Sequence, residues 1–158
     1  SKTDIMKTKI LILSFILLAA CSSSKQATKK GWGTYGSPNV EQTLLDHNTF
    51  KVDIYSDDAT YGYTQENPVM VGKGGGSGPL NERRFLNALM GPDGEPITYH
   101  RIGSCCGLKT KNGLMEDSGL LDKYSVMHKG LEEPVVIYIN MYDSDTLKIP
   151  VGFKKKKL

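Results

Sequence analysis

Residues 124–142 read YSVMHKGLEEPVVIYINMY, two apolar runs separated by a polar turn. The second run, residues 135–142, is rich in β-branched and aromatic side chains, which favour strands. Gly130 and Pro134 lie between the runs, as is typical of a tight connection. The sequence therefore predicts a hairpin of strands over residues 124–129 and 135–142, with the second strand deeply buried.

One helix is predicted on the N-terminal side of this hairpin, over residues 79–90. Pro79 suits the first turn of a helix, and the pair Gly91 and Pro92 would end it. The expected apolar stripe of this helix consists of Phe85, Leu86 and Leu89.

Apolar alternation or short apolar runs predict further strands over residues 50–55, 69–71 and 97–102. A short helical turn is expected over residues 40–46, and glycine-rich connections over residues 72–78 and 103–119. Strands, one helix and then more strands predict an α+β fold, in which a small antiparallel sheet carries one main helix on one face.

The N-terminus has the layout of a secretory signal. Lys7 and Lys9 precede an apolar run from Ile10 to Ala20, which is shorter than the roughly 20 residues needed to cross a bilayer as a helix. Residues 18–21, LAAC, are similar to a bacterial lipobox, whose cysteine is acylated and becomes the new N-terminus. We expect a cleaved signal peptide over residues 1–20, including extra residues 1–5 before Met6, and lipidation of Cys21. An ordinary signal peptide that happens to end near a cysteine is the alternative.

The remaining chain divides by composition into a tether, a body and a tail. Residues 21–36 are expected to form a lipidated flexible tether, residues 37–153 a single α+β domain, and residues 154–158 a basic tail. Residues 31–153 hold ten Lys and Arg against sixteen Asp and Glu, and this acidic body argues against nucleic acid as a partner. The basic ends are either solvated or attracted to anionic lipid head groups.

The residues after Cys21 suggest where the anchor lies. Residues 22–25, SSSK, contain neither an acidic cluster nor an aspartate. We therefore expect an outer-membrane lipoprotein of the bacterial envelope that faces the periplasm. Its expected partners are membrane lipid, through acylated Cys21, and an envelope protein or a glycan.

Cys105 and Cys106 are the only cysteines besides Cys21. Neighbouring Cα atoms lie about 3.8 Å apart, below the roughly 4.4–6.8 Å usual for a disulfide, so a bond between these two would be strained and easily reduced. Such a bond would serve as a redox switch or a rigid turn. The alternative is that one sulfur packs in the core and the other is inert.

Other candidate sites are weaker. His100 and Arg101 offer a base and an anion clamp, but alternation along a strand places them on opposite faces. Adjacent cysteines rarely serve one tetrahedral ion, so no metal site is predicted. Residues 72–78, GKGGGSG, lack the Walker spacing, and no cofactor is predicted.

Four segments, read as YGYTQENPV (residues 61–69), NERRFLNAL (81–89), YHRIGSCC (99–106) and YINMYD (138–143), resemble a family of small lipoproteins from Bacteroidetes-type bacteria. The resemblance covers nearly all of residues 48–153 and implies no mechanism. Some members carry the automatic label 2-dehydro-3-deoxyphosphooctonate aldolase. That enzyme is a cytoplasmic (β/α)₈ barrel, which needs at least roughly 200 residues. Cleavage after residue 20 of the 158 would leave an exported chain of 138 residues with one clear helix, which does not fit the label.

Two functional hypotheses remain. The first is a non-catalytic binding or assembly module of the envelope, supported by the anchor and by eight tyrosines, a residue type suited to interfaces. The second is a thiol-redox protein or enzyme built on Cys105 and Cys106 with His100 or Arg101. The absence of Cys-x-x-Cys spacing favours the first.

Overall fold

A computed structural model describes residues 40–73 and 78–157. The elements in chain order are β1 (Leu44–Asp46), β2 (Thr49–Phe50), β3 (Ile54–Tyr55), β4 (Val69–Met70), α1 (Gly78–Leu86), β5 (Leu89–Met90), β6 (Thr98–Lys109), β7 (Ser118–Met127), β8 (Val135–Asn140), β9 (Lys148–Ile149) and β10 (Lys154–Lys155). This part of the chain is therefore mixed, roughly α+β and mostly strand, with one short helix, which confirms the coarse fold class.

Four strands form the main sheet, in the order β4-β8-β7-β6. The predicted hairpin is present, because β7 pairs antiparallel with β8, from Asp122 opposite Ile139 to Val126 opposite Val135. The sheet is not purely antiparallel as expected, since β4 runs parallel to β8. The chain passes through α1 and the β6–β7 hairpin between these two strands, and this long crossover allows them to run in the same direction.

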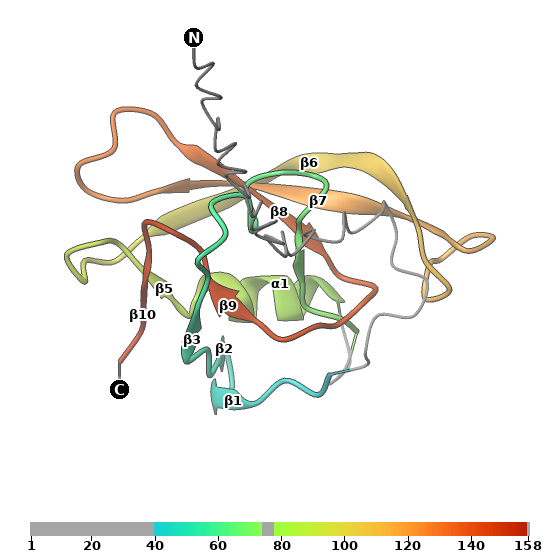
Figure 1. The fold of residues 1–158 in the computed structure, drawn as a ribbon, viewed down its shortest axis with the longest axis horizontal. Coiled ribbons are helices and arrows are strands. Elements are labelled where there is room, and N and C mark those ends of the chain that lie inside the picture. Colours follow the sequence, from blue (N-terminus) through green and yellow to red (C-terminus); the bar gives the residue numbers. More distant parts are fainter. Residues whose placement is uncertain (1–39, 74–77, 158) are drawn as a thin grey trace, which may run out of the picture.

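The helix covers one face of this sheet (Figure 1). Phe85 and Leu86 of α1 are fully buried in one cluster with Val126, Ile137 and Ile139 of β7 and β8. The apolar stripe expected for the helix is thus buried. The same cluster reaches from Phe50 to Phe153, so both ends of the described chain contribute to one core.

Three two-stranded pairs surround the main sheet: β1 with β2, β3 with β9, and β5 with β10. The pair β5–β10 corrects two predictions. The helix ends at Leu86 rather than Met90, because Leu89 and Met90 pair with Lys155 and Lys154. For the same reason the expected basic tail begins as a strand of the domain.

Two further segments differ from expectation. Residues 44–46 form strand β1 rather than a helical turn, since Leu44 and Asp46 pair with β2. The predicted strand over residues 50–55 is divided between β2 and β3, whose partners are β1 and β9.

The glycine-rich stretch from residue 103 was expected to be a connection, but β6 continues through it to Lys109. Register shifts occur between Arg101 and Gly103 and between Cys105 and Gly107. Bulges of this kind let a strand accommodate glycine and other irregular residues. The expected signal peptide, the tether and Cys21 lie outside the described residues. Within residues 40–73 and 78–157, no helix has the length and apolar character to cross a bilayer.

Candidate functional site

Cys105 and Cys106 are joined by a disulfide, with their Cα atoms 3.7 Å apart. Cys105 lies opposite Leu121 and Gly107 lies opposite Leu120, so Cys106 is the extra residue of a β-bulge. Its φ of 56° lies in the left-handed region, which residues with a Cβ rarely adopt. The disulfide therefore lies at a point where the strand already departs from regular geometry.

The disulfide packs against a small second cluster, made by Leu108, Leu121 and Tyr142. Both cysteines are only partly buried there. The expectation that one sulfur would be in the core and the other inert is therefore wrong, because the two share one bond and one environment.

Arg101 on the same strand binds Asp122 of β7 through two hydrogen bonds. Its Nε donates to Oδ2 at 2.9 Å and its Nη2 donates to Oδ1 at 2.8 Å. Ser104 Oγ also donates to Asp122 Oδ1, at 2.7 Å. Arg101 and Ser104 are three positions apart and would face opposite sides of a regular strand, so the bulge between Arg101 and Gly103 is what brings both to one carboxylate.

Glu82 of α1 lies at the inner end of this group and is fully buried. Tyr124 Oη donates to Glu82 Oε2 at 2.8 Å, whereas Oε1 meets no protein donor. Burial, together with the negative charge of Asp122, raises the pKa of Glu82 to about 7.

The pKa of Asp122 is shifted in the opposite direction from that of Glu82. Burial opposes its ionisation, but hydrogen bonds from Arg101 and Ser104 outweigh burial and lower the pKa of Asp122. A protonated Glu82 can donate to Asp122, and this interaction raises the pKa of Glu82 and lowers that of Asp122. Of the two carboxyl groups, Glu82 is therefore the one that keeps its proton to the higher pH.

The chemistry open to this group is limited by access. Glu82 and Asp122 are 0% and 4% exposed, so a substrate reaches their oxygens only if α1 or the sheet moves. The Arg101 side chain is 48% exposed, but its guanidinium already serves Asp122 and Ser104. The arrangement is suited to holding β6, β7 and α1 together.

Of the four site residues expected from sequence, the structure joins Cys105 to Cys106 and places Arg101 on the same strand. His100 is exposed and pairs across the strand with Ser125. Alternation directs it away from Arg101, as expected. The His100 side chain makes no hydrogen bond or ion pair within the described part of the chain, so no imidazole on this strand is coupled to the disulfide.

Sequence reasoning missed Glu82 and Asp122. A signal for Glu82 was present, because it lies three and four positions before Phe85 and Leu86 and so shares their buried helix face. Asp122 is an acid within the apolar run LLDKYSVM of β7. Its partner could not be inferred, since that depends on a bulge in another strand.

Among the residues that the structure describes, no three His, Cys, Asp or Glu side chains come together in a way that could hold a metal ion. Comparisons with protein-family models, with curated proteins and with solved structures gave no match for this chain.

Proposed function

We propose that this chain is a lipoprotein of the bacterial envelope and that its folded domain is a non-catalytic binding or assembly module. The location is supported by the sequence LAAC at residues 18–21, directly after an apolar run. Acyl chains on Cys21 would hold the domain at a membrane without a protein span. In this proposal residues 21–36 are the tether and the outer membrane, on its periplasmic side, is the site of attachment.

One observation carries the choice of binding over catalysis: the polar groups nearest the disulfide engage one another. Asp122 accepts from both Arg101 and Ser104, and the two thiols are consumed in one bond. A catalytic set would need a nucleophile and a base within reach of each other and of a substrate. We infer that this region is scaffold and that an envelope protein, a glycan or a lipid binds elsewhere on the domain.

Metabolic labelling with an alkyne analogue of palmitate in a bacterial host tests the anchor. The full chain is expected to take up the label, and C21A is expected to lose it. C105S/C106S is the matched control, because it removes the other two cysteines and should remain labelled. Unlabelled full chain, or label retained by C21A, would refute the lipoprotein proposal.

A thiol-redox role is the second candidate, and the partly exposed disulfide favours it. In that reaction two substrate thiols would reduce the Cys105–Cys106 bond, giving two protein thiols and one substrate disulfide, with two electrons and two protons passing to the protein. Incubation with reduced glutathione, followed by alkylation and mass spectrometry, measures this. Rapid reduction, and reoxidation by glutathione disulfide, would support the redox role, whereas a disulfide that stays intact in excess glutathione would exclude it.

A further inference from the structure

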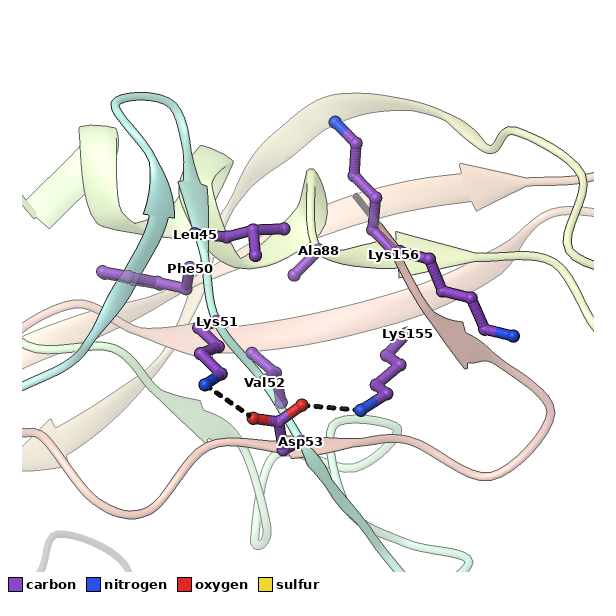
Figure 2. Close-up of a pocket in the computed structure, with 9 residues that line it drawn as sticks. Leu45, Phe50, Lys51, Val52, Asp53, Ala88, Lys155 and Lys156 are labelled. Atoms are coloured by element: carbon purple, nitrogen blue, oxygen red, sulfur yellow. Dashed lines mark hydrogen bonds and ion pairs between the residues drawn. The ribbon is translucent and has the colours of Figure 1, made fainter.

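A second region of the domain combines a cavity with concentrated positive charge. A pocket of about 230 Å³ lies among three parts of the chain: the β1–β2 hairpin with the segment after it, the turn between α1 and β5, and the end of β10 with the residues after it. It is lined by Leu45, Phe50, Lys51, Val52, Asp53, Ala88, Lys155, Lys156 and Lys157. Segments from both ends of the described chain therefore form this pocket together (Figure 2).

The charges around the pocket are unbalanced. Four lysines and one aspartate line it, which leaves a surplus of three positive charges. Lys155 Nζ lies 2.6 Å from Asp53 Oδ1 and Lys51 Nζ lies 3.6 Å from Oδ2 (Figure 2). Asp53 thus holds two ammonium groups on either side of one carboxylate. Among the described residues, Lys156 and Lys157 form no salt bridge, and Lys156 only lowers the pKa of Asp46 through its charge.

Lys155 and Lys156 are held by backbone pairing and hydrogen bonds rather than carried on a free tail. Lys155 pairs with Leu89, and Lys156 N donates to Ala88 O at 2.8 Å. Lys155 N also donates to Tyr55 Oη at 3.3 Å. Because the backbone is positioned by these bonds, the binding of an anion costs less ordering entropy than it would on a solvated tail.

The floor of the pocket is apolar. Phe50, Val52 and Ala88 are 3%, 4% and 2% exposed. A pocket of this size is below the roughly 300–1,000 Å³ typical of ligand sites, so it suits one small charged group with a short apolar stem. Lysine ammonium groups bind phosphate oxygens as mobile point charges, without the fixed planar geometry that arginine imposes.

We propose that this pocket binds a phosphate group carried by an apolar or amphipathic molecule, such as the head group of an anionic lipid. The inference rests on the binding role proposed above and gives that role a ligand class. Lys156 and Lys157 contact the phosphate oxygens, Lys51 and Lys155 add charge from beside Asp53, and Leu45 with Phe50 contacts the stem. Elsewhere the body is acidic, with sixteen Asp and Glu against ten Lys and Arg over residues 31–153, which directs an anion toward this one face.

Calorimetric titration of the full chain tests the proposal with three probes. Dihexanoyl phosphatidic acid, kept below its micelle-forming concentration, carries both the phosphate and the stem. Inorganic phosphate carries the charge alone, and dihexanoyl phosphatidylcholine carries the stem with a compensated charge. We expect phosphatidic acid to bind and phosphatidylcholine not to bind. Equal affinity for inorganic phosphate would identify a site for free phosphate, and weaker affinity would identify a lipid site.

The variant K156Q/K157Q should weaken binding of phosphatidic acid by about tenfold or more, because two direct contacts are lost. K109Q/K129Q is the matched control, since it removes the same charge from exposed positions outside the pocket, and should bind within about twofold of the unmodified chain. Circular dichroism checks that both variants fold. Equal loss in the two variants, or no binding of either phosphate probe by the unmodified chain, would overturn the proposal. Labelling of Cys21 is measured separately, so failure here and failure of the lipid anchor are distinguishable.

Discussion

Glu82 lies fully buried on α1, where it accepts a hydrogen bond from Tyr124 and feels the charge of Asp122. Its pKa is raised from the usual 4.5 to about 7, first by burial and then by the charge of Asp122. The folded protein therefore binds this proton more tightly than the unfolded chain does. Stability falls as pH rises from about 4.5 through about 7, where the folded state finally releases the proton.

The variant E82Q should remove this fall in stability with rising pH. A glutamine amide has the shape of the protonated carboxyl, with an oxygen to accept from Tyr124 and an NH₂ to donate to Asp122. Near pH 5 the variant and the unmodified chain should be about equally stable. Near pH 8 the variant should be more stable by up to about 3 kcal/mol, the free energy that corresponds to the raised pKa. Urea unfolding across this pH range measures the difference.

E133Q is the control for that series, because Glu133 is exposed in the turn between β7 and β8 and its replacement changes the net charge equally. Its stability should follow that of the unmodified chain at each pH. A fall in E82Q stability parallel to that of the unmodified chain would show that Glu82 does not carry the proton.

At the scale of elements, β6 is an edge strand of the main sheet, within the part of the chain that the structure describes. Its two bulges interrupt the regular ladder, and such irregularity discourages pairing with other chains. At one bulge Cys106 has a positive φ and is bonded to its neighbour. The disulfide thus holds Cys106 in a backbone conformation that a residue with a Cβ disfavours.

Two double variants separate the effect of the Cys105–Cys106 disulfide on stability from the effect of the left-handed backbone at residue 106. C105S/C106S removes the disulfide and leaves a side chain in the left-handed region, whereas C105S/C106G removes the disulfide and places glycine there. The glycine variant should be more stable by about 1 kcal/mol, because glycine adopts positive φ without a steric cost. Urea unfolding gives the stabilities, and hydrogen exchange at residues 104–108 reports whether the bulge persists. If the serine variant equals or exceeds the glycine variant, the left-handed bulge exists only while the disulfide does.

The elements that could be predicted from sequence are those with enough residues to show a period. The strands β7 and β8, their connection and the start of α1 have clear patterns, and so does the buried face made by Phe85 and Leu86. Two-residue strands such as β5 and β10 have no measurable period. The length of β6 could not be predicted, because glycine in its second half is typical of a connection between elements. The bulges let the strand continue through these residues.

At the scale of the whole molecule, the small pairs join distant parts of the chain. β3 pairs with β9, and β5 pairs with β10. Neither the pocket nor the surplus of positive charge around it could be predicted from sequence, because both depend on this pairing of strands that are distant in the chain. A run of lysines before the C-terminus reads as a solvated tail unless its long-range partner is known.

Deletion of residues 154–158 tests how much the pairing of β10 with β5 stabilises the fold. The loss removes the hydrogen bond from Lys156 N to Ala88 O and the one from Lys155 N to Tyr55 Oη, each worth about 1 kcal/mol net. It also uncovers apolar surface on Phe50, Val52 and Ala88, which line the pocket beneath these lysines. We expect the free energy of unfolding to fall by about 2–3 kcal/mol, measured by urea unfolding at neutral pH.

The triple variant K154Q/K156Q/K157Q distinguishes backbone from charge. It keeps every backbone hydrogen bond of β10 and retains Lys155 beside Asp53, so its stability should stay within about 0.5 kcal/mol of the unmodified chain. Its affinity for a phosphate probe should nevertheless fall, because the contacts at the rim are gone. If the truncated chain were as stable as the full one, β10 would contribute nothing to the stability of the fold. The C-terminal lysines would then be better described as a solvated tail.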